Sequence, residues 1–355
     1  MLSPLDDLPI HQVPEPVRQV GTSDRNFYDR YYFNCHPCSD EVFLITGLGQ
    51  YPNLGVTDCY ALIIHNGVHH VVRASRALGL DRSDTNIGPF HVDVIVGLQT
   101  LRVRLDPTDT DDGKQASIEF DLTWEGSSPP IQEPRHTDYD SAGRVFLDAC
   151  RMAQNGRWSG QLRVGERSWE VTPDQWWGTR DRSWGIRPSG EPEPPGIVAH
   201  LPHRGFRWLY APMQFADHSL YLICQERADG RRVLEEAVRV WPAATGRATE
   251  SLGRPEYELT WDTDKKLVER ATLRLGAVEV DVEPLVGAHI GVGTGYGFDP
   301  EWRHGMYQGD LVVQERSWDL KTDEGRAAMW GIVDTVGRFR VDGQVGYGLF
   351  EYMFI

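Results

Sequence analysis

Apolar and polar residues alternate in many short runs, which is the pattern of β-strands with one buried face. Residues 118–125 place Ile, Phe, Leu and Trp on one face and Glu, Asp, Thr and Glu on the other. Residues 278–283 alternate valine with acidic residues in the same way. Two further runs, 42–48 and 60–66, are apolar on both faces and predict strands that are buried on both sides.

Turn residues separate these runs. Asn66-Gly67 lies between two apolar runs and predicts a short hairpin, because glycine tolerates a positive φ. Asp229-Gly230 and Asp342-Gly343 mark further turns. Strands therefore recur at intervals of roughly 8–12 residues, which is typical of an all-β sandwich or barrel. Helical periodicity is weak, and residues 322–334 are the best candidate for a short helix.

A proline-rich segment divides the chain. Four prolines lie within PSGEPEPPG, and proline fixes φ and removes a backbone donor, so this segment is a stiff linker. We predict an N-terminal extension over residues 1–40, a first β domain over 41–188, a linker over 189–196 and a second β domain over 197–355.

Charge and composition exclude several classes of protein. The 355 residues include 36 Lys and Arg against 52 Asp and Glu, which gives a net charge of −16. This acidity argues against nucleic acid and against an anionic membrane surface as partners. No apolar run approaches the ~18 residues of a membrane span, and the N-terminus does not resemble a signal peptide, so we expect a cytoplasmic protein. The sequence does not indicate an oligomeric state.

The sequence predicts no cofactor. Cys35 and Cys38 form a Cys-x-x-Cys pair, but no second pair completes a zinc site, so we expect free thiols. The glycine-rich run 291–297 does not match the spacing of a nucleotide-binding loop, and we interpret it as a loop at a barrel mouth.

The densest candidate site is WWGTRDRSWGIRP, residues 176–188, which holds three of the 12 tryptophans. In an extended strand Arg180 and Arg182 share one face and Asp181 lies on the other. Asp181 has two interpretations. Paired with arginine it is an ionised structural group, whereas in an apolar cavity its pKa rises and it becomes a proton donor.

This segment resembles the Asp-His-x-Trp-Gly motif of the carotenoid 1,2-hydratase and AttH-like family. Residues 154–162, 206–230 and 346–354 fit the same resemblance, which spans roughly 85–355 and is closest to a mostly uncharacterised actinobacterial and proteobacterial branch. The resemblance implies two lipocalin-like β-barrel or sandwich domains in tandem. It also implies an apolar isoprenoid- or polyketide-like ligand, bound without metal or nucleotide.

By the same resemblance Asp181 is the acid that protonates an alkene, and Glu351 is a second catalytic candidate. The hydratase motif has His where this chain has Arg182, and arginine cannot relay protons. Arg182 is instead expected to hold an anion or to pin Asp181. The candidate ligand-binding residues are Trp176, Trp177, Arg180, Arg182, Trp184 and Tyr352.

Two functions stay open from the sequence. One is a cofactor-independent hydratase, cyclase or isomerase that acts on a hydrophobic small molecule. The other is a non-catalytic protein that binds a lipophilic ligand. A third interpretation makes Asp181 and its arginines a purely structural network. Asp181→Asn separates them. A carrier should keep binding its ligand, an acid catalyst should lose turnover and keep binding, and a structural network should mainly show a lower melting temperature.

Overall fold

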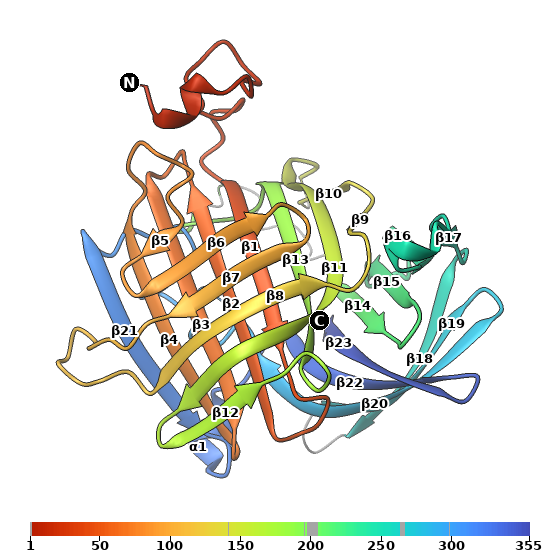
Figure 1. The fold of residues 1–355 in the computed structure, drawn as a ribbon. Helices are drawn as coiled ribbons and strands as arrows, with labels where there is room; N and C mark the ends of the chain where they lie inside the picture. The colour runs from red at the N-terminus through yellow and green to blue at the C-terminus, as the bar shows by residue number, and fades with distance from the viewer. Residues whose placement is uncertain (1, 141, 195, 197–204, 263–266, 298) are drawn as a thin grey trace.

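The alternating runs form strands that pair into two antiparallel sheets lying side by side (Figure 1). The computed structural model describes residues 2–140, 142–194, 196, 205–262, 267–297 and 299–355. Within these ranges the only α-helix is α1, Asp323–Ala327, and two short 3-10 turns cover Pro4–Asp7 and Ala243–Thr245. No helix in the described ranges is long and apolar enough to cross a membrane.

The first sheet has the order β21-β4-β3-β2-β1-β13-β11-β8-β7-β6-β5, and β9, β10 and β12 pair with β11. Its strands are β1 Phe27–Cys35, β2 Val42–Tyr51, β3 Val56–His65, β4 Val68–Ala77, β5 Asn86–Ile87, β6 Phe90–Val96, β7 Thr100–Leu105, β8 Ile118–Gly126, β9 Ile131–Gln132, β10 His136–Tyr139, β11 Val145–Val164, β12 Arg167–Val171, β13 Trp177–Ile186 and β21 Leu311–Asp319.

The second sheet has the order β17-β16-β15-β14-β23-β22-β20-β19-β18. Its strands are β14 Arg207–Gln214, β15 Ser219–Glu226, β16 Arg232–Val240, β17 Glu250–Ser251, β18 Pro255–Asp262, β19 Leu267–Leu275, β20 Val278–His289, β22 Val333–Val341 and β23 Gln344–Phe354.

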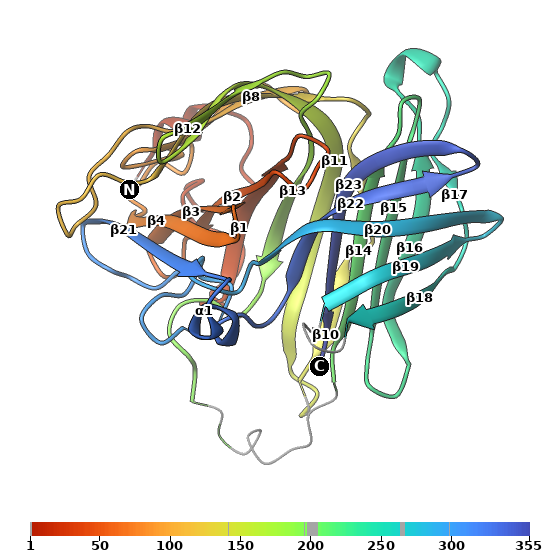
Figure 2. The same ribbon diagram turned by 90° about the horizontal axis from the view of Figure 1, so that it is seen from below.

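The first sheet curls into a nearly closed barrel, and the second is a more open curved sheet beside it (Figure 2). Large side chains fill the barrel. Trp124 and Trp158 are fully buried there, with ring centroids 5.0 Å apart in an edge-to-face arrangement. A separate cluster that includes Phe339 and Phe350 forms the core of the second sheet. The predicted all-β antiparallel fold is confirmed.

Several local predictions are confirmed as well. β8 alternates buried and exposed residues over Ile118–Gly126. Asn66 and Gly67 join β3 to β4 with φ values of 50° and 75°. The short-helix candidate 322–334 contains α1 at its start and the first two residues of β22 at its end, because α1 ends at Ala327 and β22 begins at Val333.

Two findings bear on the predicted boundaries. β1 lies within the predicted extension 1–40, yet it is a central strand of the first sheet. β21, from the second half of the chain, pairs with β4 and extends the first sheet. Residues 195 and 197–204 lie outside the described residues. The linker 189–196 and the domains 41–188 and 197–355 therefore stay predictions.

Candidate functional site

The outer face of the barrel packs against the second sheet along β11 and β13, which contact β14 and β23 (Figure 2). Apolar and aromatic side chains from both sheets bury this interface. Those from the first sheet include Tyr32, Tyr60, Ile131 and Ala153, and those from the second include Trp208, Tyr210, Val336 and Leu349. The candidate site lies within this interface rather than inside either β domain.

Strand alternation along β13 decides which side chains reach the interface. Arg182 faces the barrel, where its guanidinium lies 4.0 Å from the Tyr31 ring centroid and 2.9 Å from an Asp29 carboxylate oxygen. Asp181 points the opposite way, toward the second sheet, because successive side chains of a strand alternate. The structure therefore places Arg182 and Asp181 on opposite faces of β13, as the sequence predicted.

Asp181 occupies an environment that favours its neutral form. Burial raises the pKa of its carboxyl from 3.8 to about 7, Arg151 opposes this rise, and the negative charges of Glu133 and Glu351 add to it. The Arg151 guanidinium is itself engaged 3.5 Å from Glu133. Among the described residues no cationic side chain lies within ion-pair distance of Asp181. Near neutral pH a carboxyl of this kind is about half protonated.

Two more acidic residues lie on the second sheet, on the other side of the interface from Asp181. Asp334 on β22 is directly opposite Glu351 on β23. The Tyr32 hydroxyl donates a 2.7 Å hydrogen bond to Asp334, and the Trp208 indole N–H donates to Glu351. Burial and the charge of Glu351 raise the pKa of Asp334 well above its usual range. Because neighbouring carboxylates disfavour double ionisation, this arrangement favours the neutral form of Asp334.

Two adjacent cavities lie at this position. The smaller, of about 80 Å³, is lined by Asp181, Arg151 and Glu351 together with aromatic side chains, and we call it the acid chamber. The larger, of about 540 Å³, is mostly apolar, and we call it the apolar chamber. The two chambers share the lining residues Leu147, Arg187, Phe206, Ile290, Tyr296 and Ile332.

The glycine-rich run 291–297 forms part of the wall of the apolar chamber. Gly291, Gly295 and Gly297 line it together with Trp330, whose ring packs against Gly297. A Cβ at Gly297 would lie 2.3 Å from the Gly291 carbonyl oxygen, so the close packing of this loop requires glycine there. The predicted loop over residues 291–297 is confirmed.

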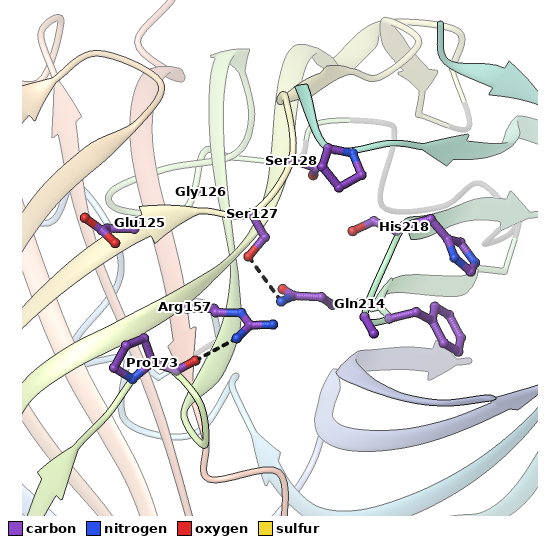
Figure 3. Close-up of a pocket in the computed structure, with 12 residues that line it drawn as sticks. Glu125, Gly126, Ser127, Ser128, Arg157, Pro173, Gln214 and His218 are labelled. Carbon is purple, nitrogen blue, oxygen red and sulfur yellow. Dashed lines mark hydrogen bonds between the residues drawn. The ribbon is translucent and has the colours of Figure 1, made fainter. Parts of the chain in front are cut away.

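A separate polar cavity of about 310 Å³ lies at the far end of the same interface (Figure 3). Arg157 on β11 and Gln214 on β14 line it, six residues beyond Arg151 and Trp208 of the acid chamber, roughly 20 Å along each strand. The Gln214 amide donates to the Ser127 hydroxyl and so links the two sheets (Figure 3). This cavity has no buried acid comparable to Asp181 among its described lining residues.

Both predicted catalytic residues, Asp181 and Glu351, line the acid chamber, although they are 170 positions apart in the sequence. The described lining of the two chambers includes none of the predicted ligand-binding residues, which are Trp176, Trp177, Arg180, Arg182, Trp184 and Tyr352.

These six side chains have other surroundings. Trp176 is buried in the barrel core, and Tyr352 in the core of the second sheet. Trp177 packs edge-on against Tyr347. Arg180 donates a 2.9 Å hydrogen bond to Gln154, and Arg182 pairs with Asp29 as described. Trp184 is 38% exposed. Strand alternation and core packing direct most of these side chains away from the chambers, whereas Trp177 shares the face of Asp181 but lies four residues away along β13, against Tyr347.

Sequence reasoning missed the residues that complete the chamber. Arg151, Tyr32 and Asp334 come from three strands distant in sequence, and each reads as an ordinary strand residue. The one available signal was the concentration of tyrosines in FYDRYYF, where polar and aromatic residues alternate in what became β1. In the described part of the chain no group of three His, Cys, Asp or Glu side chains is arranged to hold a metal ion.

Comparisons with known proteins agree with this fold. Residues 2–355 match a family of unknown function (DUF8625). No curated protein matches the sequence. The solved structure of a candidate AttH protein from Nitrosomonas europaea is similar over 98% of both chains, at 12% identity and a TM-score of 0.55. Kievitone hydratase from Nectria haematococca is similar over 92% of this chain and 88% of its own, at 13% identity and a TM-score of 0.50.

These similarities establish the fold class. The chain has an AttH-like fold, and the predicted tandem of two lipocalin-like β domains is confirmed. At such low identity the likeness concerns the fold alone, so the chemistry has to be argued from the side chains of the interface.

Proposed function

We propose a function for this chain, which belongs to a family of unknown function (DUF8625), from the chemistry of its interface site. The protein is a cofactor-independent enzyme that protonates a hydrophobic, isoprenoid- or polyketide-like small molecule. Asp181 is the acid, and the outcome is hydration, cyclisation or isomerisation of a carbon–carbon double bond.

The observation that carries this proposal is the placement of Asp181. Its carboxyl, with a pKa of about 7, lines a chamber adjacent to an apolar cavity large enough for a hydrophobic molecule. An acid is most effective when its pKa lies near the working pH, because it is then protonated and also readily gives the proton up. A structural aspartate would instead be paired with a cation and fully ionised.

The proposed reaction balances in two steps. The Asp181 carboxyl transfers its proton to one alkene carbon, which leaves an aspartate and a carbocation. In hydration, water adds to the cation and its surplus proton returns to Asp181. In isomerisation, a C–H bond adjacent to the cation breaks, a new double bond forms, and the released proton restores the acid. In cyclisation, an internal double bond first attacks the cation and forms a C–C bond, and the new cation then loses a proton from an adjacent carbon to Asp181.

Aromatic faces around the chamber support a cationic intermediate. Tyr28, Tyr32, Trp208 and Tyr296 line it, and the negative face of an aromatic ring attracts a cation. The chamber already holds one cation in this way, because the Arg151 guanidinium lies 5.2 Å from the Trp208 ring centroid and 5.4 Å from that of Tyr210. The structural likeness to a hydratase, kievitone hydratase, adds support from analogy.

The test is an untargeted conversion assay. Wild-type protein and Asp181→Asn are incubated with an apolar extract of the organism that encodes the chain, in H₂¹⁸O and separately in D₂O. Products are followed by mass spectrometry. Hydration should incorporate ¹⁸O, cyclisation or isomerisation should incorporate deuterium, and both should disappear with Asp181→Asn. Asp121→Asn, at an exposed site that pairs with Arg102, is the matched control and should behave as wild type.

The alternative is a non-catalytic lipophile-binding protein, which the size and apolar lining of the larger chamber also suit. Mass spectrometry of small molecules carried through purification separates the two. A compound that the wild-type protein retains and never converts would make the protein a carrier. Conversion by Asp181→Asn at the wild-type rate would remove Asp181 from the mechanism.

A further inference from the structure

A single arginine stands between the two chambers. Arg187 follows directly after β13 and lines both the acid chamber and the apolar chamber. Its guanidinium lies 5.3 Å from the Tyr296 ring centroid and is only partly exposed. A ligand that extends from one chamber into the other therefore passes this group.

The other arginines around the chambers already have partners. Arg151 lies 3.5 Å from Glu133, and Arg144 lies 3.2 Å from Glu193. Arg30 donates a 2.9 Å hydrogen bond to the Tyr51 hydroxyl. Arg187 differs from Arg151 and Arg144, because no carboxylate of the described residues lies within ion-pair distance of its guanidinium.

A partly buried guanidinium without a counter-ion is costly, since burial removes water without supplying a compensating charge. The cost is removed when a ligand brings an anionic oxygen. Guanidinium suits this role because its fixed fork of N–H donors matches a carboxylate in two parallel hydrogen bonds. The Asp181 carboxyl, which lines the acid chamber together with Arg187, does not provide this charge in full, because burial keeps it partly protonated.

We infer that Arg187 determines substrate specificity by binding an oxyanion, and that the substrate is an amphipathic acid. Its carboxylate, or an equally acidic oxygen, pairs with Arg187, and its apolar chain occupies the larger chamber. The inference rests on the proposed function for the choice of site. It adds the class of molecule, which the sequence described only as hydrophobic.

The placement of Arg187 also sets the register of the ligand. Since Arg187 and Asp181 line the same small chamber, an oxyanion held by Arg187 brings the first carbons of the chain next to the acid. The remainder of the chain then extends past Tyr296 and Phe206 into the apolar chamber, because both residues line both chambers.

Binding of two matched probes tests the inference without turnover. Dodecanoate and 1-dodecanol share a chain and differ in the charge of the head group. Isothermal titration calorimetry should show that wild-type protein binds dodecanoate about tenfold to hundredfold more tightly, as expected for a hydrogen bond between charged groups. Arg187→Gln should lose this preference and keep its affinity for dodecanol. Arg102→Gln, at an exposed site on β7, is the matched control and should keep the preference.

Several outcomes would overturn the inference. They are equal affinity of the wild-type protein for both probes, failure to bind either, and a preference for dodecanoate that survives Arg187→Gln. If Arg187→Gln does not fold, Arg187→Lys is measured in its place. This variant retains the positive charge and should retain the preference for dodecanoate over dodecanol. Equal binding of the two probes by a folded Arg187→Lys protein would count against the inference.

The proposed function can fail independently. If the protein selects dodecanoate through Arg187 and yet converts no compound in the ¹⁸O and deuterium assay, the inference about Arg187 stands and the proposed enzymatic function is wrong. If conversion depends on Asp181 but the protein binds both probes equally, the proposed enzymatic function stands and the inferred preference for an acidic substrate is wrong.

Discussion

Replacing Asp181 by asparagine tests the state of this carboxyl through protein stability. The pKa rises from 3.8 to about 7 in the folded protein, and each unit corresponds to about 1.36 kcal/mol, so ionised Asp181 destabilises the fold by up to about 4 kcal/mol. Because the carboxyl faces a cavity where water screens charge, we expect a value of about 2–4 kcal/mol.

The sign and the pH range follow from the raised pKa. Between about pH 4 and pH 7 the unfolded chain has lost the proton of Asp181 while the folded protein still holds it. The free energy of unfolding of the wild-type protein therefore falls as pH rises through this range. Asp181→Asn lacks this term. The variant should match the wild type near pH 4 and exceed it above pH 7, with no further change beyond pH 8.

Urea denaturation of both proteins at pH values from 4 to 9 measures the difference. Asp121→Asn serves as control and should stay within about 0.5 kcal/mol of the wild type, as surface substitutions usually do. If Asp181→Asn is less stable than the wild type at pH 8, Asp181 is an ionised partner of Arg151. The structural interpretation would then replace the acid.

Three further predictions follow from the described contacts. Tyr32→Phe removes the hydrogen bond to Asp334 and should lower the free energy of unfolding by about 1–3 kcal/mol in urea denaturation, whereas an unchanged value would show that the bond contributes nothing. Gly178→Ala places a Cβ 2.0 Å from the Asn34 carbonyl oxygen, so it should cost about 3 kcal/mol and lower the melting temperature; full stability would contradict the strand packing. Trp184→Ala should leave probe binding and conversion unchanged, because this indole is at the surface away from the chambers; a loss of either would return Trp184 to the site.

The strands could be predicted from local sequence, because a strand with one buried face shows apolar and polar residues alternating over a few neighbouring positions. β8 and the Asn66-Gly67 hairpin are examples. β1 was not predicted as a strand, because charged residues interrupt the alternation of apolar and polar residues along it. Its buried charge is satisfied only by distant partners, since Arg30 bonds to Tyr51 and Asp29 pairs with Arg82. Such pairing depends on the assembled sheet and leaves no local signal.

The site was predictable only in part for a similar reason. The motif resemblance identified Asp181, and the terminal strand identified Glu351. Proximity in sequence then suggested that the tryptophans of the motif would line the cavity, but strand geometry places Trp184 on the opposite face from Asp181. The actual neighbours of Asp181 come from other strands, and Tyr32 meets Asp334 across 302 positions.

The pairing of β21 with β4 constrains how this protein can fold during synthesis. Arg76 pairs with Leu311, so β4 lacks that neighbour until most of the chain has left the ribosome. An unpaired strand edge is a template for association with other chains, and contacts of such high sequence separation form slowly. Fragments that stop before residue 311 should therefore associate through β4, and a peptide that covers Leu311–Asp319, supplied in trans, should suppress that association.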